Sequence, residues 1–103
     1  MNILIIEDEK IASERLIEQL RKIRPEYNVV AVLDGVEAAT EWFATHQPPD
    51  LIFLDIQLSD GYCFDIFKDS EILSPVIFTT AYQDFIMKSF ELNSIDYLLK
   101  PVD

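Results

Sequence analysis

The chain has 103 residues, half of them hydrophobic and 12% aromatic, which suits a single domain with its own core and excludes disorder throughout. Its net charge of −11 repels phosphate backbones and anionic lipids, so we expect no direct contact with nucleic acid and no membrane association. The single cysteine, Cys63, cannot form an internal disulfide and fits a reducing, cytoplasmic environment.

The N-terminal half predicts two strands and two helices. An apolar run at residues 3–6 predicts a strand, and it is too short for a signal peptide or a membrane span. A helix is predicted over residues 10–24, where apolar residues recur at helical spacing: Ala12, Leu16, Leu20 and Ile23. Pro25 ends this helix, and a strand over residues 28–33 and a helix over residues 36–46 follow.

The rest of the chain continues the same alternation. Its predicted elements are a strand, a short helix, a strand, a helix and a strand, at residues 51–54, 63–68, 76–79, 84–92 and 95–99. A loop containing Ser59, Asp60 and Gly61 separates the first two. Five strands alternating with four helices predict an α/β fold with a doubly wound parallel sheet. The strands at residues 3–6 and 51–54 are the most hydrophobic and are therefore placed centrally.

Polar residues follow the predicted strands at their carboxyl ends, where open α/β sheets bind ligands. In strand order they are Glu7 and Asp8, Asp55, Thr79 and Thr80, and Lys100. Clustered carboxylates with neither histidine nor cysteine beside them in the sequence favour Mg²⁺, which neutralises their repulsion. An aspartate can attack phosphorus to form an acyl phosphate, while a lysine and a hydroxyl neutralise the phosphoryl oxygens.

Four strings at these strand ends resemble the receiver domain of two-component response regulators: LIIEDE, LIFLDIQLSDG, PVIFTTAY and SIDYLLKP. FTTAY and IDYLLKP look most like receivers attached to LytTR-type DNA-binding domains. The resemblance spans residues 2–101 and implies a flavodoxin-like sheet of strand order 2-1-3-4-5. It implies that residues 1–103 form one receiver domain, with an output DNA-binding domain outside this chain. The fifth helix of such a sheet is expected to be missing, which would expose apolar surface and favour lower stability or dimerisation.

The resemblance also implies roles for the polar residues. Asp55 would accept a phosphoryl group from a sensor histidine kinase. Mg²⁺ would bind Asp8, Asp55 and the backbone carbonyl of Gln57 directly, and Glu7 through a water molecule. Lys100 would pair with the phosphoryl oxygens.

A second set of roles concerns the output. The resemblance implies that Thr80 is the switch hydroxyl, Tyr97 the switch aromatic, and the bond from Lys100 to Pro101 cis. The surface of the predicted fourth helix and fifth strand would change on phosphorylation and mediate a homodimer or contact with an output domain; it carries Lys88, Phe90, Glu91 and Asn93. The domain would catalyse only its own phosphorylation and dephosphorylation.

Two alternatives remain open at the level of sequence. One is a pseudo-receiver, a protein-binding module that uses the fold without phosphorylation. The other is a Mg²⁺-dependent phosphohydrolase with Asp55 as nucleophile; phosphatases of this kind resembling haloacid dehalogenases carry a second aspartate at the position of Gln57. His46, the only histidine, is predicted to be an exposed residue at a helix end, which argues against a histidine-based catalytic pair.

Overall fold

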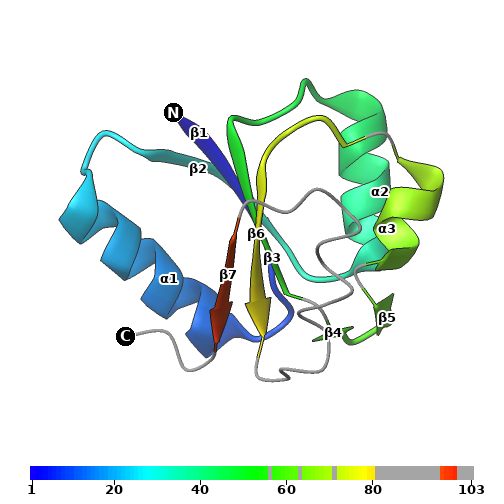
Figure 1. Cartoon of the computed structure of the whole chain (residues 1–103), viewed down its shortest axis with the longest axis horizontal. Helices are drawn as coiled ribbons and strands as arrows, with labels where there is room; N and C mark the ends of the chain where they lie inside the picture. The colour runs from blue at the N-terminus through cyan, green and yellow to red at the C-terminus, as the bar shows by residue number, and fades with distance from the viewer. Residues whose placement is uncertain (56, 63, 71, 81–95, 100–103) are drawn as a thin grey trace.

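The computed structural model describes residues 1–103 except 56, 63, 71, 81–95 and 100–103, and it describes only the backbone at residues 57, 62, 64, 69, 80 and 96–99. The described strands form a five-stranded parallel sheet in the order β2-β1-β3-β6-β7 (Figure 1). The strands span Asn2–Ile6 (β1), Asn28–Leu33 (β2), Leu51–Asp55 (β3), Val76–Thr80 (β6) and Asp96–Leu99 (β7). This is the predicted 2-1-3-4-5 order, with the two most hydrophobic strands inside the sheet.

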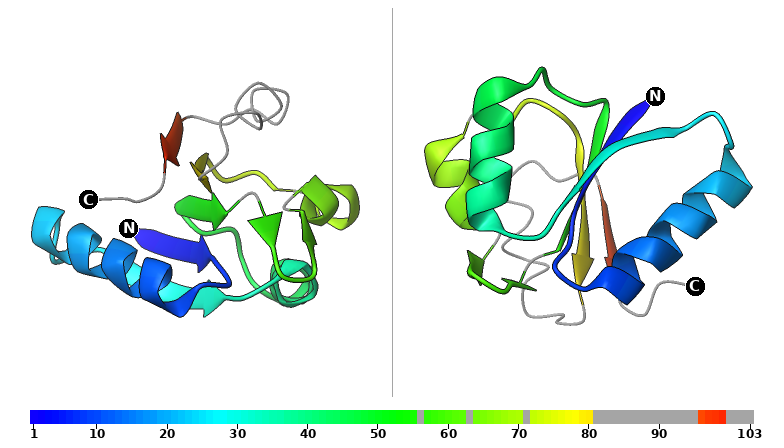
Figure 2. Two further views of the ribbon diagram at one scale, coloured as in Figure 1. Left: turned by 90° about the horizontal axis from the view of Figure 1, so that it is seen from below. Right: turned by 180° about the vertical axis from the view of Figure 1, so that it is seen from behind.

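Helices cover both faces of the sheet. Figures 1 and 2 show α1 (Lys10–Ile23) on one face and both α2 (Val36–Thr45) and α3 (Phe64–Asp69) on the other. Among the described helices, none combines the length and the apolar character that crossing a membrane requires. The prediction of a doubly wound α/β fold is confirmed.

Two cores, one on each face, explain the continuous apolar runs at residues 3–6 of β1 and 51–54 of β3. Successive residues of a strand point to opposite faces, so alternate residues of β1 serve different cores. The core beneath α1 contains Ile3, Ile5, Leu16, Leu20 and Phe53. The core beneath α2 and α3 includes Leu4, Ile6, Ala39, Leu54, Ile66 and Phe78. A strand buried on both sides has no position at which a polar side chain is favoured.

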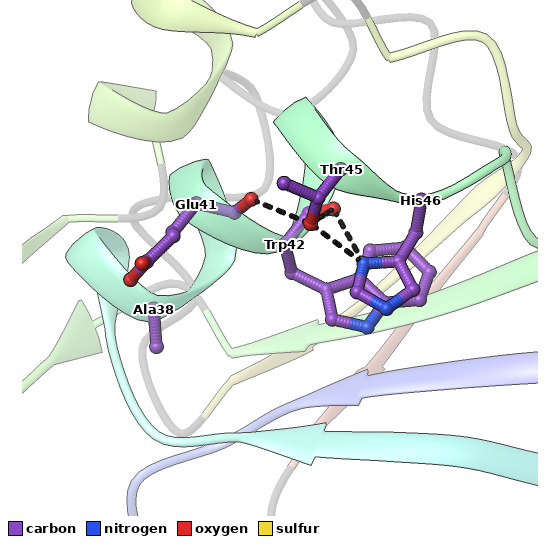
Figure 3. Close-up of a pocket in the computed structure, with 5 residues that line it drawn as sticks. All are labelled: Ala38, Glu41, Trp42, Thr45 and His46. Atoms are coloured by element: carbon purple, nitrogen blue, oxygen red, sulfur yellow. Dashed lines mark hydrogen bonds between the residues drawn. The ribbon is translucent and has the colours of Figure 1, made fainter.

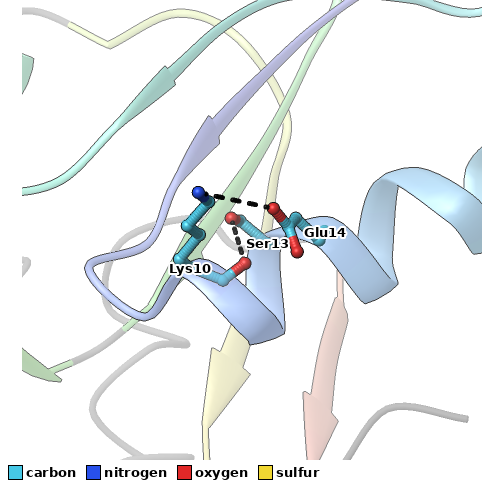
Figure 4. A network of polar contacts seen from close by, with 3 residues as sticks. All are labelled: Lys10, Ser13 and Glu14. Carbon is cyan, nitrogen blue, oxygen red and sulfur yellow. Dashed lines mark hydrogen bonds and ion pairs between the residues drawn. The ribbon is translucent and has the colours of Figure 1, made fainter.

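The buried face of α1 differs from the predicted one. Leu16 and Leu20 are buried as expected, but Ile23 is 67% exposed because the C-terminal end of the helix lies away from the strands (Figure 2). Ser13 is buried instead, and its hydroxyl donates to the carbonyl of Lys10 at 2.9 Å, which satisfies the buried group (Figure 4). On the exposed side of the same turn, Lys10 pairs with Glu14 at 4.0 Å.

A small hairpin occupies the segment that the sequence predicted to be a loop. Its strands, β4 (Gln57–Leu58) and β5 (Gly61–Tyr62), pair antiparallel. Leu58 is buried in the core beneath α2 and α3, and Gly61 has a φ of +147°, which side chains disfavour. Two-residue strands are too short to leave a periodic signal in the sequence.

The other predicted elements differ from the observed ones by one residue at one or both ends, or not at all. Residues 84–92, where a helix is predicted, and Cys63 lie outside the described residues. Trp42 and Phe43 of α2 are both half-buried against the core beneath α2 and α3.

Candidate functional site

Three carboxylates meet at the carboxyl ends of β1 and β3. Glu7 and Asp8 directly follow β1, and Asp55 is the last residue of β3. The two strands are neighbours in the sheet, and their pairing ends with Ile6 opposite Leu54. The next residues are therefore brought side by side: one oxygen from each of the three carboxylates lies within 4.8 Å of the other two. We call these three residues the acidic cluster.

Two members of the acidic cluster are held in place by their positions at the ends of β1 and β3. Glu7 and Asp55 are each 6% exposed, whereas Asp8 is exposed to solvent. The Glu7 N–H donates to the carbonyl of Leu33 at 2.8 Å, which continues the pairing of β1 with β2 by one residue. The Glu9 N–H donates to Glu7 Oε2 at 3.2 Å, so the turn into α1 also holds this carboxylate.

The chemistry of the acidic cluster fits a magnesium ion. Its donors are all carboxylate oxygens, which Mg²⁺ prefers, and the exposed Asp8 leaves one side open to water or a phosphate group. Three carboxylates at this separation repel one another, and a divalent cation between them removes that repulsion. The predicted metal-binding residues Glu7, Asp8 and Asp55 are thus placed where they could share one ion.

The threonines at the end of β6 occupy neighbouring positions in the sheet. Thr79 is buried and pairs in register with Asp55. Thr80, the predicted switch hydroxyl, is the last residue of β6, and its backbone pairs in register with Leu99 of β7. Their position brings the end of β6 to the same edge of the sheet as the acidic cluster.

The structure describes the remaining predicted residues only in part. Gln57 begins β4 shortly after Asp55, and the backbone of Tyr97 in β7 pairs in register with Phe78. Lys100 and Pro101 lie outside the described residues, as does the helical part of the predicted output surface. The roles assigned to these residues stay predictions.

Asp60 makes a contact that the sequence did not predict. Its two carboxylate oxygens accept the N–H groups of Val36 at 2.7 Å and Glu37 at 3.1 Å, which are the first two residues of α2. These two bonds hold the pKa of the Asp60 carboxyl below its ordinary value, and the bond from Val36 has the larger effect. Gly35, which has no side chain to cap the helix itself, is the one local signal of this contact.

A separate, shallow hollow of about 320 Å³ lies on the surface of α2 (Figure 3). It is lined by Ala38, Glu41, Trp42, Thr45 and His46. The ring of His46 stacks on Trp42 with centroids 4.4 Å apart, and its Nδ1 lies 3.0 Å from the carbonyl oxygen of Trp42. His46 directly follows α2 and is exposed, which confirms the prediction of an exposed residue at a helix end.

Comparison with known proteins identifies relatives over the whole chain. The sensory transduction protein LytT of Bacillus anthracis is 35% identical over 106 residues, and LytT of Enterococcus faecalis is 39% identical over the same length. LytR of Streptococcus mutans is 37% identical over 109 residues. All three alignments cover 100% of this chain but only 42–43% of the relative, so the chain spans about two-fifths of the length of these curated proteins.

Solved structures and a family model agree with these relatives. The response regulatory domain of mrkE from Klebsiella pneumoniae superposes with a TM-score of 0.83 at 27% identity, covering 100% of this chain and 85% of that one. The bacteriophytochrome response regulator RtBRR gives the same TM-score at 25% identity, covering 99% of this chain and 70% of the other. Residues 3–103 match the family model of the response regulator receiver domain. The chain therefore belongs to the response regulator receiver family and is similar to the receivers of LytT and LytR.

Proposed function

We propose that this receiver domain is a phosphoaccepting switch in which Asp55 takes a phosphoryl group from a phosphohistidine of a sensor kinase. The observation that supports this most directly is the acidic cluster. Asp55 ends an inner strand, and one of its carboxylate oxygens lies within 4.8 Å of oxygens of Glu7 and Asp8. A nucleophilic carboxylate beside a cation-binding pair of acids has the composition that phosphoryl transfer to aspartate needs.

The transfer is a balanced exchange of one bond for another. An Asp55 carboxylate oxygen attacks phosphorus, a P–O bond forms, and the P–N bond to the kinase histidine breaks. The imidazole nitrogen keeps the electron pair of the broken bond. Attack of water on the acyl phosphate later releases inorganic phosphate and restores the carboxylate. Burial of Asp55 at the end of β3 limits the access of phosphorus to its carboxylate.

Mg²⁺ would be held by Asp8, Asp55 and the backbone carbonyl of Gln57, with Glu7 acting through a water molecule. Bound there, it would supply charge neutralisation for the phosphoryl oxygens. The contact of Glu7 with the Glu9 N–H suits an indirect role, because that bond already orients one oxygen of the Glu7 carboxylate toward the turn. Asp8, which is exposed, offers its carboxylate at the open side of the acidic cluster.

The output side of the proposal concerns residues whose side chains the structure does not describe. Lys100 would pair with the phosphoryl oxygens and Thr80 would donate to them, while Tyr97 would change rotamer in response. The relatives are more than twice as long as the matched segment, which supports an output domain in a longer protein. We propose that this output domain binds DNA and that phosphorylation controls it through the surface near Tyr97.

The first test is intact-mass measurement after incubation with Mg²⁺ and acetyl phosphate, beside the control Asp55→Asn. We expect the parent to gain the mass of one phosphoryl group and the variant to gain none. A folded parent that binds Mg²⁺ but gains no mass would favour a pseudo-receiver that acts by binding. Release of many phosphates per chain from a phosphate ester would instead indicate a phosphohydrolase.

A further inference from the structure

The chain that follows Asp55 is hydrogen-bonded to α2, a helix from an earlier part of the sequence. After Asp55 the chain forms the β4–β5 hairpin, and Asp60 lies in the turn between its two strands. The Asp60 carboxylate accepts the N–H groups of Val36 and Glu37, which precede it by 24 and 23 residues. This contact joins the hairpin to the first turn of α2. We call it the hairpin tether.

The hairpin tether replaces the local cap that α2 lacks. A helix N-terminus presents unpaired N–H groups, and a Ser, Thr, Asp or Asn at the N-cap position normally accepts one of them. The N-cap residue of α2 is Gly35, so the acceptor comes from the hairpin instead. Each oxygen of Asp60 serves one N–H group, and its negative charge is favourable at this end of the helix.

Gly35 leaves room for the Asp60 carboxylate because it has no Cβ atom. A Cβ atom at position 35 would lie 2.6 Å from Asp60 Oδ1, closer than such contacts normally come. The backbone of Gly35, with φ of −172° and ψ of 179°, is extended and open to any residue. A side chain at position 35 would therefore displace the Asp60 carboxylate, which fills the space that glycine leaves.

We infer that Asp60 is a positioning residue for the acidic cluster, because the hairpin tether holds the turn of the β4–β5 hairpin, which includes Gln57, against α2. This inference rests on the proposed function, in which the backbone carbonyl of Gln57 in that hairpin binds Mg²⁺. The hairpin follows β3, and the hairpin tether anchors its turn. The helix that holds this anchor is itself packed on the sheet, because Ala39 of α2 is fully buried in the core. Residues that orient metal ligands from outside typically change metal affinity by about 10–100-fold.

The experiment separates positioning from helix capping with two variants. Asp60→Ala removes both the hairpin tether and the cap of α2. Gly35→Ser combined with Asp60→Ala restores a local cap of α2 but does not restore the hairpin tether. Serine fits at position 35 because the backbone there is extended and the space left by Asp60 accommodates the serine side chain. The probe is MgCl₂ alone, titrated while the backbone amide resonances near the acidic cluster are followed by NMR, and thermal unfolding is measured in parallel without Mg²⁺.

We expect Asp60→Ala to lose both thermal stability and Mg²⁺ affinity, the latter by about tenfold. The double variant should recover stability but keep the weakened Mg²⁺ affinity. Recovery of both in the double variant would show that Asp60 acts only as a cap and would overturn the inference. Parental Mg²⁺ affinity in both variants would overturn it as well.

The same titration distinguishes failure of this inference from failure of the proposed function. A parent that binds no Mg²⁺ would overturn both. A parent that binds Mg²⁺ but gains no phosphoryl group on Asp55 would overturn the proposed function alone, because the effect of Asp60 on Mg²⁺ affinity would still be measured.

Discussion

Asp60 places a negative charge where the first N–H groups of α2 point, and this makes its contribution to stability depend on pH. The hydrogen bonds from Val36 and then Glu37 lower its pKa in the folded state below the ordinary value of 3.8. A carboxyl whose pKa is lower in the folded than in the unfolded chain stabilises the fold fully above the unfolded value. That stabilisation is lost as the pH falls through the folded value.

The resulting prediction concerns the difference in free energy of unfolding between the parent and Asp60→Asn, which cannot ionise at this position. The difference should be constant from pH 7 to about pH 5 and should shrink below about pH 4, where Asp60 of the unfolded chain takes up its proton. Urea unfolding at a series of pH values measures it. The other carboxyls are common to both proteins, so their titration cancels. A difference that stays constant down to pH 3 would contradict the assignment of the charged Asp60 as the cap.

At the scale of the elements, the alternation of short apolar runs with amphipathic stretches was sufficient to predict the doubly wound fold, and the continuous apolar runs in β1 and β3 were sufficient to place these strands inside the sheet. The acidic cluster could be predicted from the same strands, since Glu7 and Asp8 follow β1 and Asp55 ends β3. What could not be predicted depends on contacts between distant segments. The hairpin at Gln57–Tyr62 is too short to show a periodic pattern in the sequence. Its contact with α2 joins residues 24 positions apart, and no local sequence pattern predicts such a contact.

Two residues of α1 that share one sequence pattern differ in burial, and this difference gives a prediction. Leu20 and Ile23 lie on the same apolar stripe of the sequence, yet Leu20 is 7% exposed and Ile23 is 67% exposed. Leu20→Ala should therefore cost about 2–5 kcal/mol of unfolding free energy, the range for buried leucine. Ile23→Ala, the matched control on the same helix, should change it by less than about 0.5 kcal/mol. Equal losses in chemical denaturation would mean that the end of α1 packs against the protein in solution.

At the scale of the whole molecule, the net charge of −11 means that added salt of any kind relieves repulsion. Stabilisation by MgCl₂ is therefore not by itself proof of a metal site. The contribution specific to the acidic cluster is the part that remains when MgCl₂ is compared with NaCl at equal ionic strength. It arises because an ion that binds only the folded chain shifts the unfolding equilibrium in proportion to its occupancy.

The stabilisation that is specific to Mg²⁺ gives the last prediction. At a free Mg²⁺ concentration ten times the dissociation constant, the parent should gain about 1.4 kcal/mol over the NaCl control. Asp8→Asn should lose that gain while keeping the general effect of salt, because it removes one carboxylate of the acidic cluster. Asp8 is exposed, so the change leaves both cores intact and the two proteins can be compared by the same thermal or urea unfolding. If parent and variant gained equally from MgCl₂, the three carboxylates would be a charged edge of the sheet and not a magnesium site.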